Sequence, residues 1–136
     1  MSFYNNNPLS QYKTINTSAG MEEASSHEVI QRLMAGALER IATAKGHIER
    51  NETAEKGLLI SKAISIIGAL QGCLDMERGG EISANLDSLY NYMTRQLMKA
   101  NRTNDLSLLD EVQQLMRDIK SGWDAIPQKL SEQTPA

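Results

Sequence analysis

The stretch that decides the fold is SSHEVIQRLMAGALERIATAKGHI, residues 25–48. Its apolar side chains recur at alternating steps of four and three residues, so they share one face of an α-helix. Ser25 and Glu28 form the capping-box pattern that is typical of a helix start. The pattern indicates a bundle helix with one buried seam, which consists of Ile30, Met34, Ala37, Ile41, Ala44 and Ile48.

Three further segments have a helical pattern, at about residues 53–75, 81–102 and 105–126. No proline occurs between Pro8 and Pro127, and the alternating β-branched and aromatic residues that mark strands are scarce. The turn Arg78-Gly79-Gly80 and the polar break 101–104 separate the last three segments. Connections this short make neighbouring helices antiparallel. We therefore predict an all-α fold, an antiparallel up-down four-helix bundle over residues 25–126, between a mobile N-terminal segment 1–24 and a flexible tail 127–136.

The third and fourth segments each carry one clear apolar stripe that is expected to form core. In the third it comprises Ile82, Leu86, Leu89, Met93, Leu97 and Ala100. In the fourth it comprises Leu108, Val112, Leu115, Ile119, Trp123 and Ile126. The glycines inside helices, Gly36, Gly68 and Gly72, are expected to allow tight packing within the bundle, with the close approach of another chain as the alternative.

Composition excludes several classes of function. A chain of 136 residues is long enough for one domain, and its formal net charge of −3 without a basic cluster argues against nucleic acid as a partner. The single Cys73 forms no disulfide or zinc site alone, and we expect it to be buried and structural. Neither a signal peptide nor an apolar run of membrane-spanning length is found, so we expect no membrane insertion and a cytosolic location.

The two histidines do not suggest catalysis. Neither His27 nor His47 has the glutamate three residues earlier that a di-iron bundle uses, so we expect both to be solvated. The order Lys45-Gly46-His47 is the reverse of that in a histidine phosphotransfer domain. We predict no catalytic residue, no metal site, no cofactor and no enzymatic activity.

The second segment carries more apolar surface than one core stripe needs. Leu59, Ala63, Ile66 and Leu70 form one stripe, and a second stripe widens the apolar arc to about half the circumference. Such a helix is either deeply buried or has a face left over for a partner. We predict that the second stripe and the facing third segment line an apolar groove, formed by Ile60, Ile64, Ile67, Leu74, Leu86, Tyr90 and Met93.

The stretch DMERGGEISANLDSLYNYM, residues 75–93, resembles the signature of the FliS family, the export chaperones of flagellin. Residues 26–30, 36–38 and 44–45 resemble the first helix of that family. The segment QYKTI, residues 11–15, is similar to the N-terminal segment that caps the family's groove, which makes Tyr12 and Ile15 the expected lid.

The resemblance implies a cytosolic chaperone that binds the disordered C-terminal segment of flagellin, prevents its premature polymerisation and assists delivery to the flagellar export apparatus. It leaves open whether the export gate or a second assembly factor also binds, and whether the free protein forms a weak homodimer. The alternative from another class is a signalling or phosphotransfer bundle that uses a surface histidine.

Overall fold

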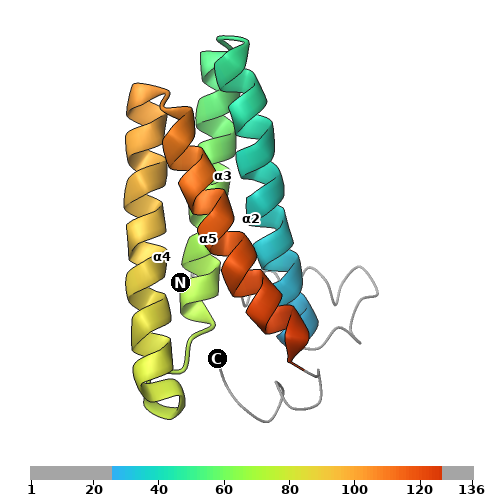
Figure 1. The fold of residues 1–136 in the computed structure, drawn as a ribbon, viewed down its shortest axis with the longest axis vertical. Coiled ribbons are helices and arrows are strands. Elements are labelled where there is room, and N and C mark those ends of the chain that lie inside the picture. The colour runs from blue at the N-terminus through green and yellow to red at the C-terminus, as the bar shows by residue number, and fades with distance from the viewer. Residues whose placement is uncertain (1–25, 127–136) are drawn as a thin grey trace, which may run out of the picture.

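The computed structural model describes residues 26–126, which form four antiparallel α-helices (Figure 1). Their bounds are α2 Ser26–Glu49, α3 Thr53–Gly72, α4 Met76–Thr103 and α5 Leu106–Ala125. This confirms the all-α four-helix bundle. The expected lid residues Tyr12 and Ile15, the cap residue Ser25 and the tail 127–136 lie outside the described residues.

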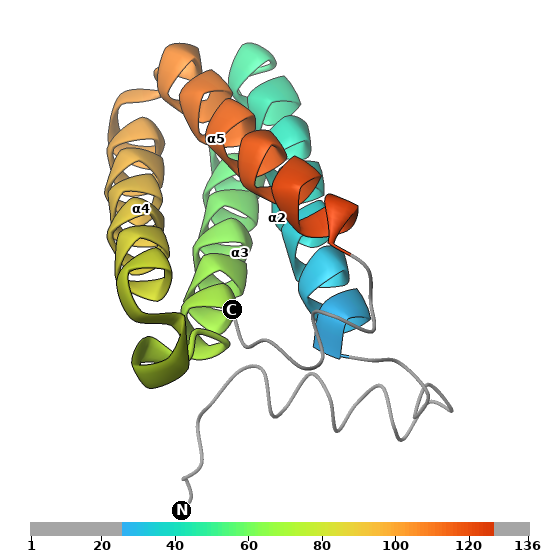
Figure 2. The same cartoon turned by 60° about the horizontal axis from the view of Figure 1, so that its bottom comes forward.

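The helices contact one another as a ring. α2 packs against α3 and α5, and α4 packs against the same two helices. The contact between α2 and α3 is the most extensive. α5 runs obliquely, with its first turns beside the end of α4 and its last turns beside the start of α2 (Figures 1 and 2). Each helix therefore has two neighbours and an outer face.

The predicted seam of the first helix is confirmed. Ile30, Met34, Ala37, Ile41 and Ala44 are buried, and Ile48 is half-buried against them. α3 contributes Ile60, Ala63, Ile67, Ala69 and Leu70 to the same core. The hydrophobic effect thus joins α2 and α3 along their whole length.

Two asparagines in the left-handed conformation end helices at the same end of the bundle. Asn51, with φ 59°, closes α2 in a Schellman motif in which the Glu52 amide donates to the His47 carbonyl oxygen at 2.8 Å. Asn104, with φ 58°, closes α4 through its amide, which donates to the Ala100 carbonyl oxygen at 2.7 Å. Asparagine tolerates this conformation better than most residues, which explains why the chain turns at these points.

α4, which corresponds to the third predicted segment, starts at Met76 instead of residue 81 and contains a kink. α3 ends at Gly72 instead of residue 75, and Asp75 caps a new helix by accepting hydrogen bonds from the amides of Glu77 and Arg78. This first turn is separated from the rest of α4 by Gly80, whose φ is 52° and ψ −126°. The predicted Gly-Gly turn is therefore a glycine kink within α4, since only glycine adopts these angles readily.

The predicted core stripes of the last two helices are only partly buried. In α4, Met93, Leu97 and Ala100 are buried, but Ile82 is 69% exposed. In α5, the buried residues are Leu109, Val112, Gln113 and Met116, whereas Leu108, Leu115, Ile119 and Trp123, with Ile126 just after the helix, are half-buried. The predicted stripe on α5 is therefore rotated from the observed core, because the chain offers two adjacent apolar stripes on that helix.

Candidate partner-binding surface

Side chains of α4 and α5 are hydrogen-bonded to each other in the second half of α4. The Tyr92 hydroxyl donates to Glu111 Oε2 at 2.7 Å, and Gln96 Nε2 donates to Glu111 Oε1 at 3.0 Å. These hydrogen bonds lower the pKa of the Glu111 carboxyl group. They also place one side of α5 toward α4 at this level of the bundle.

The other end of α5 is bonded to α2. Trp123 Nε1 donates to the His27 carbonyl oxygen at 3.1 Å, and Gln31 Nε2 donates to Asp124 Oδ1 at 2.8 Å. α5 therefore moves away from α4 as it approaches the start of α2, a divergence that both ribbon views show (Figures 1 and 2). The first half of α4 thereby lacks the neighbour that its second half has.

Apolar side chains lie on both sides of this divergence. Leu115 and Ile119 follow Glu111 by four and eight residues, so they share the side of α5 that faces α4. On α4, Leu89 precedes Tyr92 by three residues and therefore points toward α5. We call this set the α4–α5 apolar face, and its members are Ile82, Leu86, Leu89, Leu115 and Ile119. Ile82 is strongly exposed, and the other four are half-buried.

Exposed apolar residues elsewhere on the described surface are more isolated. Leu58 on α3 is 58% exposed, but its neighbours one turn away are Ala54, Glu55, Ser61 and Lys62, none of them a large apolar residue. Met98 on α4 is 56% exposed, and polar residues surround it at the corresponding positions. Ile82 differs because Leu86 and Leu89 continue the same stripe. A contiguous apolar stripe marks an interaction site better than scattered single residues do.

The structure places four of the seven predicted groove residues in the core. Ile60, Ile67 and Met93 have no exposed surface, and Tyr90 is 2% exposed, with burial raising the pKa of its hydroxyl group. Ile64, Leu74 and Leu86 are half-buried. The placement is corrected for a physical reason: α3 lies between α2 and α4, so its wide apolar arc is used against two neighbours.

Four members of the α4–α5 apolar face were not among the predicted groove residues: Ile82, Leu89, Leu115 and Ile119. Sequence reasoning assigned them to core stripes. The sequence does contain a sign that Leu115 and Ile119 lie at the margin of the core. A second apolar stripe on α5, formed by Leu109 and Met116, competes with them for the core. A helix with two such stripes buries one fully and presents the other at the margin.

His27 is buried, which corrects the expectation of a solvated side chain. It is 4% exposed, and its ring stacks on Trp123 with the centroids 4.9 Å apart and the planes 20° from parallel. Its Nδ1 is buried and has no hydrogen-bond partner. The stack adds to the hydrogen bonds that hold the end of α5 against the start of α2.

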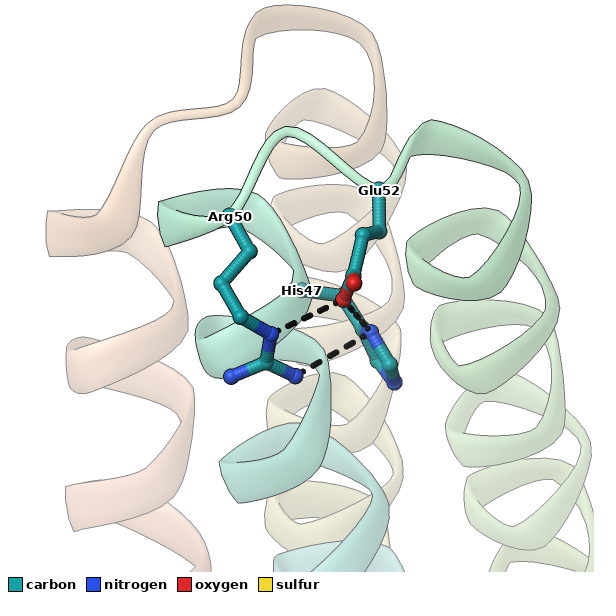
Figure 3. Close-up of polar contacts among 3 residues, drawn as sticks. All are labelled: His47, Arg50 and Glu52. Carbon is teal, nitrogen blue, oxygen red and sulfur yellow. Dashed lines mark hydrogen bonds and ion pairs between the residues drawn. The ribbon is translucent and has the colours of Figure 1, made fainter.

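His47 is half-buried in a polar cluster at the turn between α2 and α3 (Figure 3). Its Nδ1 lies 2.6 Å from Glu52 Oε1, to which Arg50 Nε also donates at 2.9 Å. The short contact with a carboxylate favours a proton on Nδ1, which then donates to Glu52. These hydrogen bonds, first that of His47 and then that of Arg50, lower the pKa of the Glu52 carboxyl group. Neither histidine therefore offers the freely solvated imidazole that the phosphotransfer alternative needs.

Cys73, the remaining candidate for chemistry, has a structural role. Cys73 is half-buried instead of fully buried, and its thiol donates to the Ala69 carbonyl oxygen at 3.3 Å. Within residues 26–126 no group of three or more His, Cys, Asp or Glu side chains is arranged to hold a metal ion. Nor does any helix in that range have the length and apolar character needed to cross a membrane.

Comparison with known proteins assigns the chain to a family. The family model described as "Flagellar protein FliS" matches residues 6–130. The chain is 52% identical over 118 residues to the flagellar secretion chaperone FliSB of Pseudomonas aeruginosa, covering 87% of this chain and 94% of that protein. It is 41% identical over 128 residues to the flagellar secretion chaperone FliS of Vibrio cholerae, covering 94% of each. The protein of the same name from Salmonella typhimurium is 37% identical over 131 residues, covering 96% of this chain and 97% of that protein.

Proposed function

Because the chain belongs to the FliS family of flagellar secretion chaperones, which are not enzymes, we propose that it binds the C-terminal segment of flagellin on the α4–α5 apolar face. It would bind in the cytosol, prevent premature polymerisation and assist delivery to the flagellar export apparatus. The observation that carries the proposal is the divergence of α5 from α4, which leaves a contiguous apolar stripe at the surface. No cofactor is needed for this activity.

The chemistry of the face suits a disordered client. A segment without stable structure can fold into an amphipathic helix as it lays apolar residues against an apolar surface. The half-buried side chains already pack against the core, so they are held in place before the client arrives. Preorganisation of this kind lowers the entropic cost on the chaperone's side, while the client still loses conformational freedom.

The N-terminal segment is part of the same proposal. Tyr12 and Ile15 would cover the α4–α5 apolar face in the free protein and give way when the client binds. Shielding would limit self-association of an otherwise exposed apolar stripe. A weak homodimer through this face would follow when the shield is displaced, and the export gate or a second assembly factor would meet the chaperone with its client bound.

The test places a charge on the face and measures binding. Ile82→Asp should leave the bundle folded, since the side chain is 69% exposed, and should weaken binding of a labelled flagellin C-terminal peptide by about tenfold or more. Leu58→Asp is the matched control, because Leu58 is similarly exposed on α3. Fluorescence anisotropy gives the affinity, and circular dichroism melting confirms that both variants fold.

Two outcomes would contradict the assignment. One is a folded Ile82→Asp variant that binds the peptide with wild-type affinity, together with a folded Leu89→Asp variant that does the same. The other is an equal loss in Leu58→Asp, which would mean that the peptide is attracted to exposed apolar residues in general.

A further inference from the structure

A shallow pocket lies between α2 and α3, the pair of helices across the ring from α4 and α5. It holds about 350 Å³ and is lined by Arg40 of α2 and by Ser61, Lys62, Ser65 and Ile66 of α3. The four α3 residues form two adjacent pairs one turn apart, so they present a continuous strip along the helix. The pocket is thus separate from the α4–α5 apolar face.

Gly36 lies beside two of the lining residues where α2 approaches α3. A Cβ atom at this position would lie 3.5 Å from Ile66 Cδ1 and 3.7 Å from Arg40 Nη1, both ordinary contact distances. The guanidinium group of Arg40 and the apolar Ile66 side chain thus meet at the same point of α2. Apolar and cationic surface are therefore adjacent, which suits a ligand with an aliphatic stem and an anionic end.

The charge of the pocket is positive, although the protein as a whole carries −3. Among the described residues, those lining the pocket include two cations, two hydroxyls and no carboxylate. Arg40 Nη1 donates to Oε1 of the adjacent Glu39 at 2.9 Å, but the Glu39 side chain is 74% exposed. An exposed pair of this kind contributes little free energy, so a ligand carboxylate can compete for the guanidinium group.

We propose that this pocket binds an acidic segment of a partner protein other than the client. A Glu side chain would lay its methylene groups on Ile66 and accept hydrogen bonds from Arg40, Lys62 and the serine hydroxyls. The pocket is shallow and open, so a small free anion would stay largely hydrated there and gain little. A peptide with several carboxylates gains further contacts along the α2–α3 crevice, since multiple weak sites on one chain reinforce one another.

The test uses a fluorescent acetylated and amidated hexaglutamate peptide at low ionic strength. The full chain should bind it, and the double variant Arg40→Gln/Lys62→Gln should weaken binding by about fivefold or more through the loss of two charge-assisted contacts. Lys99→Gln/Arg117→Gln removes the same two charges from exposed positions on α4 and α5 and should change affinity by less than about twofold. Because Arg40 is half-buried, the single Lys62→Gln variant, at an exposed position, is measured as well.

Each outcome decides the proposal. Selective weakening in the Arg40 and Lys62 variants, with amide NMR shifts at Ser61 and Ser65 on titration, supports it. Equal loss in the Lys99/Arg117 control would mean long-range attraction without a site, and absence of binding to the wild-type chain would also overturn the proposal. Binding of hexaglutamine as strongly as hexaglutamate would show that charge is irrelevant. Amide NMR shifts at Ser61 and Ser65 on titration with millimolar inorganic phosphate, without binding of the peptide, would assign the pocket to a small anion instead.

Discussion

The two ends of the bundle are built differently. At the end with the α2–α3 and α4–α5 turns, side chains bond from one helix to the next, and Lys56 Nζ donates to the Asn101 carbonyl oxygen at 2.7 Å and to Asn104 Oδ1 at 2.8 Å. At the end with the α3–α4 turn, Met76 is 51% exposed and Ile82 69% exposed. Side chains also join helices at the second end, where Gln71 Nε2 donates to Asp87 Oδ1 at 3.0 Å and to Asn91 Oδ1 at 2.9 Å. We call the first end the polar end and the second, which leaves apolar side chains exposed, the open end.

The difference shows how a small bundle combines stability with a binding surface. At the polar end, asparagines in the left-handed conformation end α2 and α4, and Lys56 joins α3 to the end of α4. This arrangement allows α5 to separate from α4 further along without loss of the fold, because its last turn is held by α2 through His27 and Trp123. A bound client could therefore move α4 and α5 further apart at the open end without breaking the hydrogen bonds at the polar end.

The largest expected effect comes from Lys56, which is 4% exposed and lies at the polar end. Lys56→Met should lower the free energy of unfolding by about 2 kcal/mol, because two oxygen atoms at the end of α4 lose their donor. The positive charge beside a helix C-terminus is lost as well. Urea denaturation monitored by circular dichroism measures the change.

Lys62→Met is the control on the same helix, where the side chain is exposed, and should change the unfolding free energy by about 0.5 kcal/mol or less. If Lys56→Met proves as stable as the wild type, the polar end does not fix the helices and the contrast between the two ends fails. Flagellin peptide binding by the folded Lys56→Met variant should be retained, since the residue is remote from the α4–α5 apolar face.

Sequence predicted the bundle well because its signals are local. The seam of α2 and the absence of proline depend only on residue spacing, and both correspond to what the structure shows. The position of the open face depends on how obliquely α5 crosses, which spacing does not encode. For that reason Ile60 and Ile67 were assigned to a groove although they are core, and Ile82 to the core although it is exposed.

The second prediction compares two glycines that have no neighbour within 4 Å of an added Cβ. Gly80→Ala should destabilise the protein by about 1 to 2 kcal/mol, because its φ of 52° and ψ of −126° are costly for any residue with a Cβ. Gly68→Ala should stabilise it by about 0.5 to 1 kcal/mol, because Gly68 lies within α3, where alanine is favoured and space is open. The tight packing expected around Gly68 is not observed.

Thermal denaturation of both variants measures these opposite signs. If Gly80→Ala and Gly68→Ala changed the stability by the same amount and in the same direction, Gly80 would not hold the kink in solution. The kink belongs to the open end, so Gly80→Ala should also alter peptide binding, whereas Gly68→Ala should not. A binding loss in Gly68→Ala of the same size would show that backbone rigidity in general, and not the kink, controls the open end.

The smallest expected effect concerns acid and the polar end. Hydrogen bonds from His47 and Arg50 lower the pKa of Glu52 in the folded state, so its contribution to stability is present above the unfolded-state pKa of 4.5 and is lost as pH falls through the lower folded-state value. Glu52→Gln should therefore be slightly less stable than the wild type at pH 7 and lose less stability between about pH 5 and pH 3, so that the two proteins converge in acid. Urea denaturation across this pH range measures the slope, with Glu55→Gln as the exposed control at the start of α3. A pH dependence in Glu52→Gln identical to that of the wild type would show that the pKa shift of Glu52 contributes nothing to acid sensitivity. That sensitivity would then come from other carboxyl groups whose pKa values hydrogen bonds lower, such as Glu111, Asp105 and Asp124.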